Sequence, residues 1–186
     1  MEFSVPQKLA DGRRFLKISG CMIQLNGVRL QEGLGSTNVT IEVPESLHEK
    51  ISARDEEIVA KAKEEKMTWF GADLKDETIQ AAFQSSLTDG TLGVALAKLK
   101  GVVVTKAFDC QKVAVELESV EAGTQCDVLV ELAGLWFLKK SFGGVWRIIQ
   151  TRVRGPPKPP TFPTQYMFED EVEEEQAEDD PSDYID

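Results

Sequence analysis

The stretch CDVLVELAGLWFLKKSFGGVWRIIQTRVR (Cys126–Arg154) decides the fold expected of this 186-residue chain. Residues 126–140 are apolar on both alternating faces, which is the pattern of a central strand covered on two sides. SFGG (141–144) then supplies a turn, and residues 145–154 have the composition of a returning strand. We therefore expect an antiparallel hairpin at the centre of a sheet.

Shorter strand-like segments occur on the N-terminal side of this hairpin. Arg13–Leu25 is strand-like, and Asn26-Gly27 after it is typical of a tight hairpin turn. Val39–Val43 alternates between apolar and polar residues. Strand patterns return in residues 91–108 and 112–120, so the C-terminal half of the chain is predicted to form a meander of strands.

A helical period separates the two groups of strands. Ser46 is a predicted N-cap, with Glu49 completing a capping box, and Gly71 marks the predicted end of this first helix. A second helix is predicted for Asp76–Leu87. The order of strands, two helices and further strands predicts an α+β fold. It is either a curved antiparallel sheet or an OB-like small barrel with two inserted helices.

Charge divides the chain into a body and a tail. The net charge is −11, yet residues 169–186 contain 11 Asp and Glu and no Lys or Arg, which leaves 21 acids and 21 bases in residues 1–168. A block of like charges repels itself and has little apolar surface to bury, so we expect a disordered acidic tail at 169–186. Residues 155–168 are predicted to be a Pro-rich extended spacer after a domain at 1–154.

Several classes of function lack a recognisable pattern in this sequence. Cys21, Cys110 and Cys126 are far apart and His48 is the one histidine, so we expect reduced thiols, no metal site and no cofactor. There is no phosphate-binding loop, and His48 lies in a charged stretch typical of a solvated helix surface, which argues against an enzyme. Without an apolar run long enough to span a membrane or a signal-peptide core, a soluble intracellular protein is expected.

A basic and aromatic region is the strongest candidate for binding. Leu132–Phe168 contains six Lys and Arg, seven aromatic residues and no acid. Cations neutralise phosphates and exposed rings stack on bases, a combination found in proteins that bind single-stranded nucleic acid. The predicted contacts are the phosphate-binding Lys139, Lys140, Arg147, Arg152 and Arg154 and the stacking rings of Phe142 and Trp146. Trp136 and Phe137, in the apolar strand, are expected in the core.

The last strand does not alternate cleanly. Trp146, Ile148, Gln150, Arg152 and Arg154 share one face under a strict period of two, and Val145, Arg147, Ile149, Thr151 and Val153 share the other. Neither face is purely apolar, so we expect this strand to present some of its bases, and with them Trp146, to solvent.

The acidic tail gives the basic region a possible competitor. A tethered polyanion can occupy a cationic groove at high effective concentration and leave when a long strand binds. Its end, DDPSDYID (179–186), combines acids with Tyr184 and Ile185, which suits docking into a basic, apolar pocket on a partner. A merely solubilising extension is the alternative.

Two stretches carry a resemblance to a known family. KMTWFGADLKDETIQAAFQSSL (66–87) and residues 127–154, followed by an acidic end, resemble the single-stranded DNA-binding proteins of nucleocytoplasmic large DNA viruses, the poxvirus-type family. The resemblance implies a non-enzymatic protein that coats single-stranded DNA in replication, repair or recombination, in the nucleus or at a cytoplasmic viral replication site. Its expected partners are single-stranded DNA or RNA and, through the tail, replication proteins, with no membrane partner. Homo-oligomerisation is left open.

Two alternatives remain at this point. An acidic-tailed chaperone or adaptor that binds basic proteins such as histones would use the tail itself as its binding segment. A scaffold protein would instead use exposed apolar residues for self-assembly.

Overall fold

The computed structural model describes residues 1–10 and 12–155. In this part of the chain twelve strands form one continuous sheet, and β9 and β10 pair separately. The elements are β1 (Glu2–Phe3), β2 (Gln7–Lys8), β3 (Arg14–Ser19), β4 (Met22–Leu30), β5 (Asn38–Glu42), η1 (Glu45–Leu47), α1 (His48–Glu64), α2 (Lys66–Phe70), α3 (Asp76–Ala82), β6 (Phe83–Gln84), β7 (Leu87–Thr88), β8 (Thr91–Leu96), β9 (Lys98–Leu99), β10 (Val102–Val103), β11 (Lys106–Phe108), β12 (Ala114–Val115), η2 (Leu117–Ser119), β13 (Gln125–Phe137) and β14 (Phe142–Val153). The predicted acidic tail, and all of the predicted spacer except Gly155, lie outside the described residues.

Five of the strands close into a barrel. The hydrogen-bonded order is β13, β4, β5, β8 and β14, and β14 returns to pair with β13. Neighbouring strands are antiparallel except β8 and β14, which run parallel. Numbered along the chain, the barrel strands follow the order 1-2-3-5-4 and back to 1. The fold is therefore α+β with an OB-like barrel, as predicted.

The first barrel strand is interrupted. β3 pairs with residues 134–137 of β13 and β4 pairs with residues 125–131, so the two strands run in the same direction along one edge of β13. The predicted hairpin turn at Asn26-Gly27 is wrong, because both residues lie inside β4. Gly27 has φ of +74°, and the pairing with β13 shifts register between Cys126 and Val128. The dipeptide forms a β-bulge that bends the strand.

The helices are inserted between β5 and β8, where helices were predicted, but their boundaries differ. The chain leaves α-helical geometry at Glu65, so α1 and α2 replace one predicted helix, which ends as expected at Gly71 with φ of +74°. The capping box at Ser46 is wrong, because a 3-10 turn precedes α1 and no side chain caps it. The second predicted helix ends at Ala82, because from Phe83 the chain is extended and pairs with β14.

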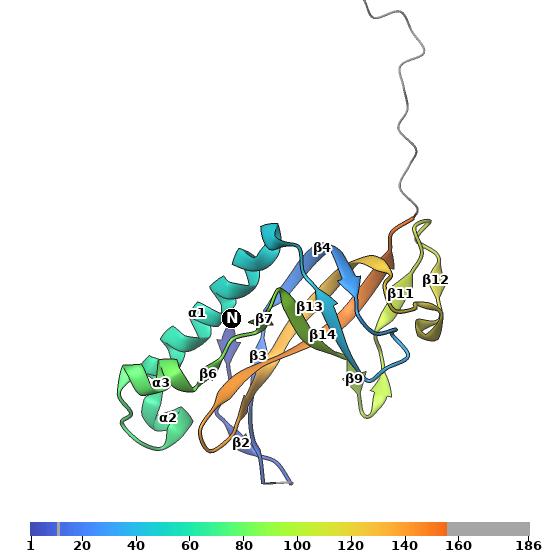
Figure 1. The fold of residues 1–186 in the computed structure, drawn as a ribbon. Coiled ribbons are helices and arrows are strands. Elements are labelled where there is room, and N and C mark those ends of the chain that lie inside the picture. Colours follow the sequence, from blue (N-terminus) through green and yellow to red (C-terminus); the bar gives the residue numbers. More distant parts are fainter. Residues whose placement is uncertain (11, 156–186) are drawn as a thin grey trace, which may run out of the picture. The chain divides into compact units, whose positions relative to one another are not determined.

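The three helices lie together on one side of the sheet, and β11 and β12 lie on the opposite side (Figure 1). The predicted apolar face of α1 is confirmed, since Ile51, Ile58 and Ala62 are buried. Aromatic side chains pack α2 against the β13–β14 hairpin. The ring centroids of Trp69 and Phe137 are 6.1 Å apart, and those of Phe70 and Phe142 are 5.3 Å apart. The helices thereby cover the hairpin end of the barrel.

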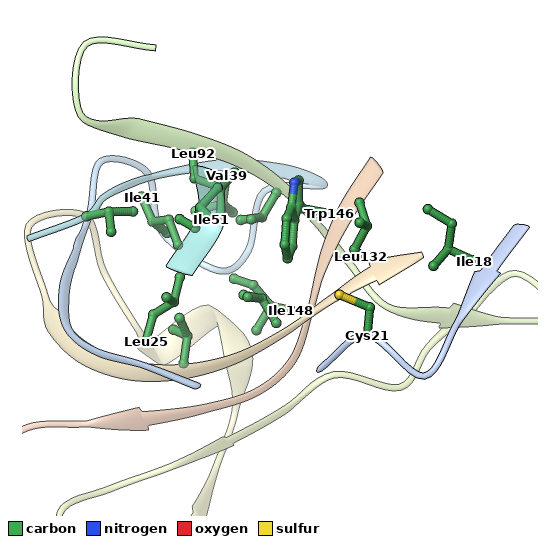
Figure 2. Close-up of a cluster of buried hydrophobic side chains, with 14 of the residues drawn as sticks. Ile18, Cys21, Leu25, Val39, Ile41, Ile51, Leu92, Leu132, Trp146 and Ile148 are labelled. Atoms are coloured by element: carbon green, nitrogen blue, oxygen red, sulfur yellow. The ribbon is translucent and has the colours of Figure 1, made fainter. Parts of the chain in front are cut away.

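A bulge divides β14 into two segments with opposite alternation. Leu129 of β13 is opposite Gln150, but its neighbour Val130 is opposite Ile148, so Ile149 is the extra residue. Trp146 and Ile148 therefore point into the core before the bulge, and Thr151 is buried after it. Figure 2 shows Trp146 inside a cluster of buried side chains with Leu132 and Ile148.

A buried carboxylate holds Trp146 from the helix side. The Trp146 Nε1–H donates to Ser86 Oγ at 2.8 Å, and Ser86 Oγ donates to Asp55 Oδ1 at 2.5 Å. Asp55 also accepts from the Ser86 N–H at 2.8 Å and from Ser85 Oγ at 3.1 Å. Burial raises the pKa of Asp55, and the three donors oppose this rise. This network joins α1 to the barrel core.

Replacing Asp55 by Ala should lower the free energy of unfolding by about 1–3 kcal/mol, because three hydrogen bonds from Ser85 and Ser86 lose their buried acceptor. Urea unfolding followed by circular dichroism measures the change. The control is Glu56→Ala on the adjacent, exposed position of α1, which should alter stability by less than about 0.5 kcal/mol. Equal effects of the two substitutions would show that the Asp55 network contributes nothing specific.

Candidate nucleic-acid interface

The two rings predicted to stack on bases are buried. Phe142 is 1% exposed and Trp146 is 3% exposed, so the stacking role predicted for both is wrong. Phe142 packs against Phe70, Phe83 and Phe137, with centroid separations of 5.3 to 5.8 Å. Phe70 belongs to α2 and Phe83 to β6, so the segment inserted between β5 and β8 helps to bury this ring. Trp136 and Phe137 were expected in the core; Phe137 is buried and Trp136 is half-buried.

The predicted cations do not converge at one point. Lys139 and Lys140 are exposed in the turn between β13 and β14. Neither forms an ion pair with any residue in the described part of the chain. Arg152 follows Lys140 by twelve residues, which at about 3.3 Å per residue is a path of up to roughly 40 Å along the hairpin strand. The hairpin turn and the C-terminal end of β14 are thus separate basic sites.

The arginines of β14 lie on the outside of the barrel. The bulge at Ile149 brings Arg147 and Arg152 onto the same outer face, although strict alternation places them on opposite faces. Arg147 is opposite Glu131 of β13 and donates to it from Nε and Nη2 at 2.7 Å. Sheet pairing therefore fixes one arginine near the middle of β14.

Asp127 orients the other two arginines. Its carboxylate accepts from Arg152 Nη2 at 2.6 Å and from Arg154 Nε at 2.7 Å, and the Gly27 N–H at the β4 bulge donates to it at 2.9 Å. Burial acts to raise the pKa of Asp127, but the hydrogen bonds from Arg152, Arg154 and Gly27 hold it below its ordinary value. The two arginine side chains remain 49% and 42% exposed, so they are oriented and still accessible.

Strand β11 adds residues that were not predicted. It runs parallel to β14, with Lys106 opposite Gln150 and Phe108 opposite Arg152. Lys112 follows in a turn in which Asp109 accepts from the N–H groups of Gln111 and Val113 at 2.8 and 2.9 Å. We call the following set the basic face: Lys106, Phe108, Lys112, Arg147, Gln150, Arg152 and Arg154. Its five cations outnumber the two carboxylates, Asp127 and Glu131, that pair with them.

The sequence contained an indication of these additional residues. Residues 91–108 hold three lysines and no acid, a composition like that of the region from Leu132 onward. Strand patterning alone could not show that β11 pairs with β14, because the pairing joins segments about forty residues apart.

A second concave surface lies on the outside of β5 and β8. It is a cavity of about 410 Å³ lined by small and polar side chains that include Asn38, Thr40, Gly93 and Ala95. Glu32 also lines it and accepts from the Thr40 N–H at 2.6 Å, and its lining contains no Lys or Arg. The basic face is therefore better suited to bind phosphates than this surface is.

Three other features of the described residues concern metal binding, cysteine chemistry and membrane spanning. Residues 1–10 and 12–155 contain no group of three or more His, Cys, Asp or Glu side chains placed to hold a metal ion. Cys21 and Cys126 are buried and Cys110 is exposed, and all three are free thiols. None of the helices in this part of the chain has the length and apolar composition needed to cross a bilayer.

The Asp127 cluster should make stability depend on pH. Asp127→Asn should lower the free energy of unfolding by about 1–3 kcal/mol at neutral pH, because the ionised partner of two arginines is lost. A lowered folded-state pKa means that this contribution is present above the unfolded value of about 3.9 and is lost as pH falls further. The difference between wild type and variant in urea unfolding should therefore shrink below about pH 4.

Exposed Glu118 provides the control for this measurement, because it forms no ion pair in the described residues. Glu118→Gln should have little effect at any pH. A difference between wild type and Asp127→Asn that stays constant from neutral to acid pH would contradict an ionic role for Asp127.

Three solved structures with a similar fold are of one bacteriophage protein. The C-terminally truncated single-stranded DNA-binding protein from bacteriophage Enc34 matches with a TM-score of 0.50 and 12% identity, over 85% of this chain and 98% of that chain. Another structure of the phage protein gives 0.49 and 14% identity over 86% and 93% of the two chains. Its complex with single-stranded DNA gives 0.49 and 12% over 83% and 97%. At these identities the likeness concerns the fold alone.

No curated protein sequence matches the chain. A family model does match, over residues 26–170, which include the whole barrel except the N-terminal part of its first strand. The chain therefore belongs to the family of unknown function DUF5871.

Proposed function

We propose that this protein binds single-stranded DNA on the basic face and coats it during replication, repair or recombination. The observation that carries the proposal is a group of five cations on the outside of an OB-like barrel, beside the half-buried ring of Phe108. Carboxylates orient the three arginines of this group. The fold similarity to the truncated Enc34 protein, whose name describes it as single-stranded DNA-binding, supports the same class. The proposal also agrees with the expectation drawn from residues 66–87 and 127–154, which resemble poxvirus-type single-stranded DNA-binding proteins.

Each group on this face has a role in the proposed complex. The cations Lys106, Lys112, Arg147, Arg152 and Arg154 neutralise phosphates, and binding releases the counterions that these phosphates held. Lys139 and Lys140 lie in the loop between the fourth and fifth barrel strands, one of the two loops that OB barrels use for oligonucleotides. We propose that they contact a more distant part of the same strand.

The acidic tail regulates this binding in our proposal. Residues 169–186 would compete with DNA for the cations of the basic face and, once displaced, recruit replication proteins. The opposite sign of charge and the covalent tether support this role, because a tether raises the effective concentration of a weak competitor.

Reversing two charges on the basic face should weaken DNA binding. Lys106→Glu/Lys112→Glu should reduce affinity for an oligo-dT of about ten nucleotides at least tenfold, and should lower the slope of log K against log salt by about 0.7 per lost phosphate contact. Fluorescence anisotropy at several salt concentrations measures both quantities. Neither lysine forms an ion pair in the described residues, so folding should be preserved.

The matched control reverses two exposed lysines on the helical side, Lys50 and Lys75. The variant Lys50→Glu/Lys75→Glu has the same net charge and should lose much less affinity. Equal losses would show that total charge, and not the basic face, determines binding. If the wild-type protein binds no oligo-dT at low salt, the proposed function is wrong.

Deletion of residues 169–186 should tighten binding to oligo-dT, most strongly at low salt, because the competing polyanion is removed. Anisotropy titrations of the full chain and of the deletion variant measure the effect. A variant with the acids of the tail changed to Asn and Gln keeps the length and should behave like the deletion. Weaker binding after either change would contradict a competitive role of the tail.

A further inference from the structure

The basic face contains a cavity with a lining suited to a planar ligand. It has a volume of about 330 Å³ and lies between β4, β11, β13 and β14. Its side-chain lining includes Gln24, Phe108, Lys112, Leu129, Gln150 and Arg152. The volume is at the lower end of the roughly 300–1,000 Å³ of small-molecule sites, which suits one small ring system better than a large cofactor.

Strand register shows how these side chains are arranged. Gln24, Leu129, Gln150 and Lys106 are successive partners across β4, β13, β14 and β11, and therefore form one row on the outer face. Asp127, Arg152 and Phe108 form the next row. Arg152 thus lies between the carboxylate that orients it and the ring of Phe108, with the apolar side chain of Leu129 in the adjacent row.

The two rows offer complementary chemistry. The Phe108 ring and the Arg152 guanidinium are both planar groups on which a base can stack. The Gln150 amide is exposed and has no hydrogen-bond partner in the described residues, so both its donor and its acceptor are available. The Gln24 amide donates to Asn26 Oδ1 at 2.7 Å, which leaves its carbonyl oxygen free. Amides of this kind pair with the edges of nucleobases.

The turn after β11 places a cation at the same cavity. Asp109 closes this turn through its two backbone hydrogen bonds, and Lys112 has φ of +68° within it. Lys112 and Arg152 therefore provide positive charge beside the apolar and amide groups. A ligand with a flat ring and an attached phosphate would match all of these groups together.

We propose that this cavity holds one nucleobase of the bound strand, stacked on Phe108 and Arg152 and hydrogen-bonded to Gln150. The inference rests on the function proposed above and adds to it a base-contacting site. It assigns the stacking role to Phe108 in place of the buried Phe142 and Trp146.

The test separates base contacts from phosphate contacts. Affinities of the full-length protein are compared for an oligo-dT and for an oligodeoxyribose phosphate of equal length without bases, at one salt concentration. Wild type should bind the base-free strand about 5- to 100-fold more weakly than oligo-dT. Phe108→Ala should lose affinity for oligo-dT by a similar factor and bind the base-free strand like wild type. Lys106→Glu/Lys112→Glu should weaken binding to both.

Three further variants separate the proposed base contacts from a general loss of structure. Phe108→Trp keeps a planar ring and should retain affinity for oligo-dT, and Gln150→Ala removes only an exposed amide and should lose part of it. Val113→Ala changes an exposed apolar residue near Phe108 and should have no effect.

Three results would overturn the inference. The base-contacting site alone is wrong if wild type binds both strands equally, or if Phe108→Ala weakens binding to both strands by the same factor. If wild type binds neither strand, both this site and the proposed function are wrong.

Discussion

The closure of the barrel through β14 is the constraint on which the rest of the structure depends. β14 pairs with β13 over its length, and its other edge pairs in turn with β6, β8 and β11. A strand with partners on both edges has two distinct faces, one of which must enter the core. Trp146 and Ile148 fill that inner face, so the outer face is free to carry charge. Because the apolar residues of β14 occupy its inner face, the arginines of this strand lie on its outer face.

The bulge at Ile149 explains why sequence patterning described β14 only in part. Strict alternation places the apolar Trp146 and Ile148 on the same face as Arg152. It places Arg147 on the other face with Thr151, so neither predicted face was purely apolar. The inserted residue Ile149 reverses the alternation in the second half of the strand. The side chains that point into the core are therefore uncharged along the whole strand, and the charged side chains point outward. A mixed pattern on both faces of a long strand was thus an indication of a bulge. The turn predicted at Asn26-Gly27 was also wrong because of a bulge, since a glycine with positive φ occurs in bulges as well as in turns.

What the sequence predicted correctly was local. The β13–β14 hairpin, the strand at Asn38–Glu42 and the buried face of α1 depend on residues a few positions apart. The candidate site depended on distant pairings that local patterns do not contain. Trp146 is buried partly through Ser86, sixty residues earlier, and the ring on the outer face comes from β11. Composition indicated the basic segment, whereas the grouping of its cations with Lys106 and the exposure of each aromatic ring required the tertiary fold.

A buried carboxylate within a face that we propose to bind phosphates requires a physical reason. Asp127 cancels part of the positive charge of Arg152 and Arg154, which reduces the long-range attraction for phosphate. In exchange, its hydrogen bonds hold two flexible side chains in fixed orientations, so less conformational entropy is lost when a ligand binds them. Lys106 and Lys112 form no ion pair within residues 1–10 and 12–155, so no carboxylate there offsets their positive charge. In the proposed complex the lysines therefore supply attraction that salt screens, and the arginines supply the fixed geometry against which a base can stack.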